Sequence, residues 1–221
     1  MRTVRFEEWP RAVADATPDL DPEGQRITIH AYRLLARGEP VTPAQIAEAA
    51  GVPRKRTEKV LRSWRLVLWD DHGRVVGFFG LQSHHVEPTH RIEVDGTPVF
   101  GWCAGDTLLI PEILGTTAKV ESADPLSGAT IRLTVTPEGA TGLEPTEAVM
   151  SLLYPEGELT ETAIQSFCHR VYFFESPGSA REWIGDRPGM FTVTIDEAFQ
   201  LGRLVNRLRL GSAMDQTGTT S

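Results

Sequence analysis

Two cysteines and one nearby aspartate are the residues of this chain that could do chemistry together. Cys103 stands three positions before Asp106, and Cys168 is the only other cysteine among the 221 residues. A thiol and a carboxyl group at this spacing could supply a soft nucleophile and a proton-handling group to one small site. Free cysteines are also often buried as small hydrophobic side chains, so cysteine content alone does not decide between chemistry and packing.

Cys103 and Asp106 stand where a predicted strand passes into a predicted helix. The Asp-Gly pair at 95–96 separates two alternating segments, which predicts a hairpin whose second strand leads to Cys103. The apolar run 107–114 predicts a buried helix that Gly115 ends. Asp106 is therefore either a helix N-cap or a functional acid. Cys103 should feel the positive end of the helix dipole, which lowers the pKa of a thiol.

Cys168 falls in the segment 167–174, which is predicted as a β-strand preceded by a short helix over 160–166. Alternate side chains of a strand share a face, so Cys168 and Arg170 should point one way and His169 the other. We therefore expect His169 to have a structural role.

The first 80 residues have the pattern of a winged helix. Predicted helices and two short strands follow one another at 25–37, 43–50, 53–64, 66–69 and 74–79. This order predicts a winged-helix-like N-terminal domain over residues 1–80.

The third of these helices is strongly basic. Six basic residues lie between positions 54 and 65, opposed only by Glu58. Such a helix could contact the phosphates of DNA, or it could pack on acidic groups of its own chain or face water. Residues 1–80 hold 13 basic and 11 acidic residues, whereas the remainder holds 9 and 19. The acidic larger part argues against nonspecific binding to nucleic acid or membranes.

The remainder of the chain, 81–221, predicts a mixed domain built on antiparallel β-sheet with flanking helices. Further strands are indicated at 118–122, 130–136, 147–154 and 190–195. A final helix over 196–210 should place Ala198, Leu201, Leu204, Val205 and Leu208 on its apolar side. The fold class is therefore α+β, with the winged-helix-like part first.

Composition sets the broad class of protein. Hydrophobic residues make up 40% and charged residues 24% of the chain, which is ordinary for a soluble globular protein. No run approaches the roughly 20 apolar residues that span a bilayer, and residues 1–10 do not resemble a secretory signal. We expect a cytoplasmic protein whose two cysteines remain thiols.

Two segments of the chain resemble those of the alkylmercury (organomercurial) lyases. Trp102 to Leu108, WCAGDTL, resembles the first cysteine segment of that family, and Gln165 to His169, QSFCH, resembles the second. Weaker similarity extends over about residues 90–210. Two motifs in the same order are far more specific than either cysteine alone.

The resemblance implies an enzyme that cleaves the carbon–mercury bond of alkyl- and arylmercury compounds, giving the hydrocarbon and Hg(II). It implies Cys103, Cys168 and Asp106 as catalytic residues that also bind mercury. It further implies a winged-helix part that serves the structure rather than reading DNA, no organic cofactor, no resident metal, and a mercuric reductase that accepts Hg(II).

The chemistry of these residue types agrees with such roles. Thiolates are the ligands that a soft metal such as mercury prefers, and ligation by two of them weakens the mercury–carbon bond. A carboxyl group can then pass a proton from thiol to carbon, and we expect Asp106 to do so. Low-molecular-weight thiols would be needed for turnover. The order of attack by Cys103 and Cys168 stays open, and Trp102 could either offer its ring face to the metal or wall the site.

Two other classes of protein fit the same residues. A thiol-based metal sensor would use Cys103 and Cys168 as a switch and bind DNA through the winged helix. A soft-metal binding protein would hold the ion without catalysis, although Asp106 favours the enzyme.

Overall fold

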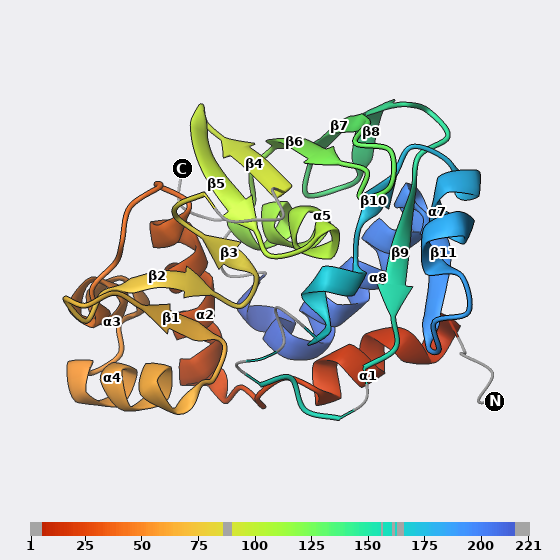
Figure 1. Ribbon diagram of the computed structural model, residues 1–221. Helices are drawn as coiled ribbons and strands as arrows, with labels where there is room; N and C mark the ends of the chain where they lie inside the picture. The colour runs from red at the N-terminus through yellow and green to blue at the C-terminus, as the bar shows by residue number, and fades with distance from the viewer. Residues whose placement is uncertain (1–5, 86–89, 156, 161, 163–165, 215–221) are drawn as a thin grey trace.

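Antiparallel sheets with helices packed against them make up the computed structural model shown in Figure 1. The structure describes residues 6–85, 90–155, 157–160, 162 and 166–214. Helices dominate the first third of the chain, and strands with flanking helices form the rest. The predicted α+β class is confirmed.

The N-terminal elements follow the predicted order closely. After the 3-10 turn η1 (Phe6–Glu8) they are α1 (Trp9–Asp15), α2 (Pro22–Leu35), α3 (Pro43–Ala50), α4 (Arg54–Ser63), β1 (Val67–Trp69) and β2 (Val75–Phe78). Thr42 and Gln45 form a capping box at the start of α3, and Gly51 ends the helix in the left-handed region with a φ of 61°. Local capping chemistry therefore fixes the turn between α3 and α4.

Helix α1 lies apart from α2, α3 and α4, across the molecule beneath β9 and α8 (Figure 1). Its Trp9 is buried, and the indole Nε1 donates a hydrogen bond of 2.8 Å to the carbonyl of Leu153. Helix α1 thus packs against the C-terminal half of the chain.

The larger sheet runs without a break across residue 80. Its strand order is β1-β2-β3-β5-β4-β6-β7-β8, with β3 (Leu81–Gln82), β4 (His90–Val94), β5 (Thr97–Gly101), β6 (Ala118–Ala123), β7 (Thr130–Val135) and β8 (Ala140–Glu144). The predicted turn at Asp95 and Gly96 joins β4 to β5, and both residues have positive φ. The short strand β3 joins the N-terminal hairpin to β5, so the two parts of the chain share one sheet.

The smaller sheet has the order β10-β9-β11, with β9 (Val149–Leu153), β10 (Phe173–Phe174) and β11 (Met190–Thr194), and α7 (Pro177–Ile184) packs on it. The prediction of a strand over 167–174 was wrong for most of its length, because Cys168–Arg170 forms the 3-10 turn η2. The side chain of Ser151 donates to the carbonyl of Arg170 and accepts from the amide of Tyr172. The amide of Ser151 still donates to the carbonyl of Tyr172 at 2.9 Å, so pairing with β9 ends at Tyr172 and the side-chain bonds of Ser151 take over before it. Of the helix predicted at 160–166, residues 161 and 163–165 lie outside the described residues.

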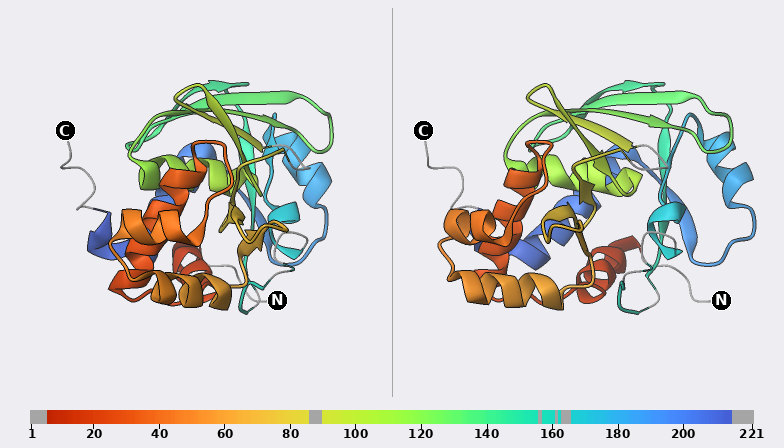
Figure 2. Two further views of the ribbon diagram at one scale, coloured as in Figure 1. Left: turned by 90° about the vertical axis from the view of Figure 1, so that its left-hand side faces the viewer. Right: turned by 60° about the vertical axis from the view of Figure 1, so that its left-hand side comes forward.

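Helices α5 (Ala104–Leu114) and α8 (Ile195–Leu210) pack against each other beneath the larger sheet (Figure 2). Glu112 of α5 accepts hydrogen bonds of 2.9 Å from both Arg203 and Asn206 of α8. Gly202 allows the close approach, since a Cβ there would lie 3.1 Å from the Leu109 side chain. This contact fixes the axis of α5, whose N-terminus carries the cysteine motif.

The apolar side predicted for α8 is wrong at two of its five positions. Leu204 and Leu208 are 46% and 48% exposed, whereas Ala198, Leu201 and Val205 are buried as predicted. Arg209 takes the position on the inner side that was expected for Leu208. The neighbouring α5 contributes the polar Glu112 to this contact, so the buried stripe of α8 is narrower and more polar than its leucine spacing indicates.

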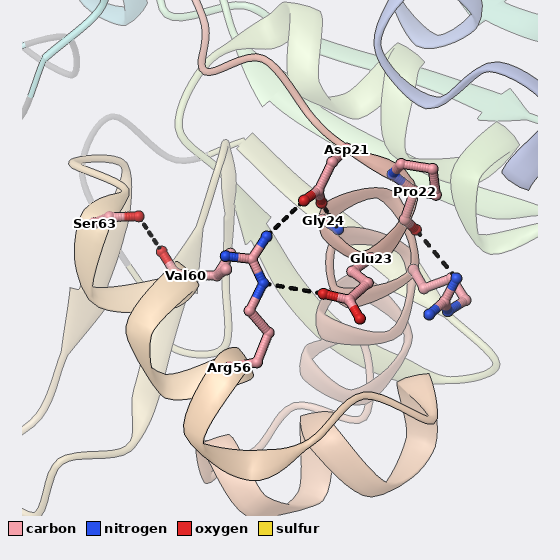
Figure 3. Close-up of polar contacts among 8 residues, drawn as sticks. Asp21, Pro22, Glu23, Gly24, Arg56, Val60 and Ser63 are labelled. Carbon is pink, nitrogen blue, oxygen red and sulfur yellow. Dashed lines mark hydrogen bonds and ion pairs between the residues drawn. The ribbon is translucent and has the colours of Figure 1, made fainter.

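Three arginines of α4 have partners within the chain, and Figure 3 shows those of Arg56. Arg56 contacts Asp21 at 2.5 Å and Glu23 at 3.0 Å, both at the start of α2. Arg54 pairs with Glu58 at 3.0 Å, and the guanidinium of Arg62 lies over the ring of Trp69.

None of the helices in the described part of the chain has the length and apolar character that crossing a bilayer requires.

The buried carboxylate of Asp124 joins the β6–β7 turn to α7. It accepts hydrogen bonds from the amides of Leu126, Ser127 and Glu175 and from the Ser179 hydroxyl. Burial alone would raise the pKa of Asp124, but these hydrogen bonds together lower it below its usual range.

Asp124→Ala is therefore expected to lower the free energy of unfolding by about 2–4 kcal/mol, because several buried donors lose their acceptor. A lowered pKa in the folded state means that the stabilisation is present above about pH 4 and is lost as the pH falls through the folded pKa. Chemical denaturation of Asp124→Ala at pH 7 and pH 3 measures both effects. Asp186→Ala, at an exposed position, is the control; an equal loss in the two variants would contradict the prediction.

Candidate active site

Cys103 and Asp106 form the start of α5. Cys103 is the N-cap with extended backbone, and Asp106 is the third helical residue. The carboxylate of Asp106 accepts a hydrogen bond of 2.8 Å from the amide of Cys103, which makes a capping box. The interpretation of Asp106 as an N-cap was wrong, because the helix begins at Ala104, before the apolar run from which its start was predicted.

Cys168 reaches this helix start from the turn η2. The amide of Ala104 donates to the carbonyl of Val171 at 3.1 Å, which joins the backbone after Cys168 to the first turn of α5. The two Sγ atoms and a carboxylate oxygen of Asp106 all lie within 4.8 Å of one another. The structure thus brings together the three side chains on which the two-thiol hypothesis depends.

The thiol of Cys103 is not activated in the resting protein. Its hydrogen bond with the Cys168 thiol, its burial and the nearby Asp106 carboxylate all raise the pKa of Cys103. The prediction that the helix dipole lowers this pKa was therefore wrong, because burial and two neighbouring acidic groups outweigh the dipole. Both cysteines are buried free thiols.

Asp106 is held near the point at which it can take or give a proton at neutral pH. Burial raises the pKa of Asp106 to about 7, although hydrogen bonds from the Cys103 thiol and from the amides of Cys103 and Trp102 oppose this shift, as does the charge of Arg209. A carboxyl group with this pKa can act as both acid and base near pH 7.

A mostly apolar cavity of about 90 Å³ lies over the three side chains. Its walls come from both halves of the chain and include Trp9, Tyr32, Leu66, Phe79, Trp102 and Val205. Trp102 is buried, and its indole Nε1 donates to Gln82 at 3.2 Å, so its ring rather than its N–H group borders the cavity. This volume can hold a small organic group or a few water molecules.

Gly80 is a residue of the site that sequence reasoning missed. It has a φ of 99°, and a Cβ at this position would overlap the carboxyl group of Asp106. Its carbonyl accepts from the amide of Trp102 at 2.9 Å, and the preceding carbonyl of Phe79 accepts from the hydroxyl of Tyr32 at 2.7 Å. The only sequence signal was a glycine directly after the apolar strand.

Arg209 is the second residue that was missed. It lines the cavity from the last turn of α8, with its Cζ 5.0 Å from the centre of the Phe79 ring. The signal was the position of an arginine four residues after the buried Val205, on the inner side of the helix.

The histidines in the described ranges form no further cluster of metal-ligating side chains. Within the described ranges, Cys103, Asp106 and Cys168 are the one group of at least three metal-ligating side chains. His90 is buried with its Nδ1 at 2.8 Å from Ser122, and His84 contacts Gln82. The prediction that His169 points away from Cys168 relied on strand alternation, which does not apply because the backbone there forms a 3-10 turn. The buried Nε2 of His169 has no hydrogen-bond partner among the residues described.

Comparisons with known proteins identify one family. The family model described as alkylmercury lyase (MerB) matches residues 85–206. An alkylmercury lyase of Staphylococcus epidermidis is 36% identical over 189 residues, covering 86% of this chain and 83% of the relative. One from Bacillus cereus is 38% identical over 173 residues, covering 78% and 77%.

A solved structure shows the same fold. The crystal structure of the mercury-bound form of MerB2 superposes with a TM-score of 0.71 at 20% identity, covering 92% of this chain and 97% of that one. The sequence similarity covers both cysteine motifs and most of the length of each relative. The chain therefore belongs to the alkylmercury lyase family.

Proposed function

We propose that this alkylmercury lyase cleaves the carbon–mercury bond at the cluster of Cys103, Cys168 and Asp106. The observation that carries the proposal is the convergence of two sulfurs and one carboxylate oxygen within 4.8 Å, beside a mostly apolar cavity. Two soft ligands and one proton carrier are the groups that protonolysis of an organomercurial needs.

In the first step one thiol displaces the ligand X of R–Hg–X. A sulfur–mercury bond forms, the mercury–X bond breaks, and the thiol proton leaves with X. The raised pKa of Cys103 keeps that thiol protonated in the free enzyme, so the mercury ion itself must favour loss of the proton. Either cysteine can attack first.

In the second step Asp106 takes the proton of the remaining thiol, and that sulfur also binds mercury. Electron density donated to mercury by two thiolates weakens the mercury–carbon bond. Asp106 delivers the proton to carbon as this bond breaks. The products are R–H and Hg(II) held by both sulfurs. The face of Trp102 borders the organic group and mercury as part of the substrate-binding wall.

Product release requires further thiols. Mercury held by two thiolates leaves by exchange with other thiolates, so low-molecular-weight thiols regenerate the enzyme. A mercuric reductase is the partner that would consume the Hg(II). A reducing cytoplasm suits both the free cysteines and this exchange, and the enzyme needs no organic cofactor or resident metal.

Residues 1–80 serve as a winged-helix-like structural domain next to the catalytic domain 81–221, and not as a DNA-binding domain. Two observations support this role. Arg54, Arg56 and Arg62 have partners within the chain, and Figure 3 shows those of Arg56. Tyr32 and Phe79 from this part line the cavity over the sulfurs.

The test is hydrocarbon release. With methylmercury or phenylmercury and excess thiol, the enzyme should release methane or benzene over many turnovers. A DNA-binding metal sensor would instead give no hydrocarbon and salt-dependent binding to duplex DNA. Binding of one mercury without hydrocarbon release would indicate a storage protein and contradict the proposal.

A further inference from the structure

The turn at Phe79 and Gly80 lies directly against the carboxyl group of Asp106. A Cβ on Gly80 would overlap that carboxyl group, so the Cα of Gly80 is in contact with it. The carbonyl of Gly80 accepts from the amide of Trp102 at 2.9 Å, while the carboxylate itself accepts from the amide of Cys103 at 2.8 Å. A shift of this turn would therefore move or free the proton-carrying group of the site.

Phe79 has a backbone conformation that a phenylalanine does not adopt without support. Its φ is 40°, in the left-handed region, where bulky residues are strained. Asp95 is the other non-glycine residue with positive φ in the described part of the chain, and it stands in a tight hairpin turn that favours aspartate. Phe79 directly follows strand β2 and has no such turn preference. Contacts from elsewhere in the chain must hold its conformation.

Two hydrogen bonds fix the peptide groups on both sides of the Phe79 Cα. The amide of Phe79 donates to the carbonyl of Leu66 at 2.9 Å. Its carbonyl accepts from the hydroxyl of Tyr32 at 2.7 Å in a buried position. The second bond fixes the peptide group that joins Phe79 to Gly80. The hydroxyl of Tyr32 thus sets the position of the residue that contacts Asp106.

Tyr32 is itself firmly held. It comes from α2, its side chain is buried, and its ring meets the ring of Phe78 edge-on with the centroids 5.3 Å apart. Burial raises the pKa of Tyr32, so its hydroxyl keeps the proton that it donates. Its oxygen hydrogen-bonds the guanidinium of Arg209, and a phenol that accepts from a cation is a stronger donor. The hydroxyl is therefore a fixed and strong donor to the turn.

We propose that Tyr32 is a positioning residue for the proton transfer: its hydroxyl holds the turn at Gly80, and through that turn it holds the carboxyl group of Asp106 beside the sulfurs. This inference rests on the proposed function and assigns a role in it to the N-terminal part of the chain. The sulfurs have supports of their own, since Cys103 begins α5 and the turn η2 carries Cys168. Loss of the hydroxyl should therefore slow proton delivery to carbon and leave the capture of mercury intact.

Tyr32→Phe removes this hydroxyl and keeps the ring. With phenylmercury and excess thiol, kcat for benzene release should fall about 10- to 100-fold, the range expected when a catalytic group is displaced by up to about 1 Å. In a single turnover, mass spectrometry should show phenylmercury bound to the protein as fast as in the wild type, followed by slow release of benzene. KM should stay the same or fall, because capture is unaffected.

Matched side chains separate the hydrogen bond from the shape of the ring. 4-Aminophenylalanine at position 32 retains an N–H donor and should restore most of kcat. 4-Fluorophenylalanine fills the space of the hydroxyl without a donor and should not restore it. Tyr154→Phe removes a phenol hydroxyl outside the walls of the cavity and should keep the wild-type kcat. Tyr32→Phe combined with Gly80→Ala should be little slower than Gly80→Ala alone, because both changes act through the position of Asp106.

Three results would overturn the inference: an unchanged kcat in folded Tyr32→Phe, equal slowing of mercury capture and benzene release, as a general loss of structure would cause, or equal rates with the amino and fluoro side chains. If Tyr32→Phe does not fold, the comparison of the amino and fluoro side chains decides. Failure of the wild type to release benzene would instead overturn the proposed function.

Discussion

Cys168→Ser is expected to lower the rate of hydrocarbon release from phenylmercury by on the order of 10³-fold or more, since residues that act as a unit lose most activity when one is removed. The remaining thiol of Cys103 can still capture the organomercury cation, but a hydroxyl is a poor ligand for a soft metal. Mercury would then carry one thiolate, and its bond to carbon would stay strong.

Capture and cleavage can be measured separately in this variant. Stoichiometric binding of phenylmercury followed by mass spectrometry should persist in Cys168→Ser, whereas benzene should not appear. Cys103→Ser should behave in the same way, and the double variant should be little slower than either single one. Near-normal benzene release from Cys168→Ser would show that one sulfur suffices.

Gly80→Ala is expected to lower kcat by on the order of 100-fold, the effect of moving a catalytic group by about 1 Å. The added Cβ would overlap the carboxyl group of Asp106, and a φ of 99° is unfavourable for alanine. The carboxylate must therefore move away from Cys103 or the turn must open.

Gly51→Ala is the matched control for this substitution. Gly51 also has a positive φ, 61°, but a Cβ there meets no atom within 4 Å. Both variants should lose stability from backbone strain, roughly 1–3 kcal/mol, while only Gly80→Ala should lose most of its activity. Steady-state kinetics with thermal unfolding of both variants measure the two effects. Full activity of folded Gly80→Ala would contradict the assigned position of Asp106.

Local signals predicted the elements that carry the site. The Asp95-Gly96 turn and the apolar run of α5 each specify their own conformation through turn and helix-end preferences. The cysteine segments identified Cys103, Asp106 and Cys168 through resemblance to a family. These features could be predicted because each depends on residues close together in the chain.

The remaining features depend on contacts between distant residues. The 3-10 turn at Cys168 is set by Ser151, and the raised pKa of Cys103 is set by Cys168 and by burial. Gly80 and Arg209 belong to the site because the N-terminal turn and the end of α8 meet over Asp106. No local pattern contains such information. An arginine on the side of a helix that is predicted to be buried is the one local sign that the position belongs to a site.

The most direct test of the account is the position of mercury in this enzyme. Anomalous diffraction from crystals soaked with Hg(II) should show one ion bonded to the sulfurs of both Cys103 and Cys168, next to the carboxyl group of Asp106. The proposed reaction leaves its product at this place, between groups that lie within 4.8 Å of one another. Mercury on a single sulfur, or on His90 and His169 with both thiols free, would contradict the central claim.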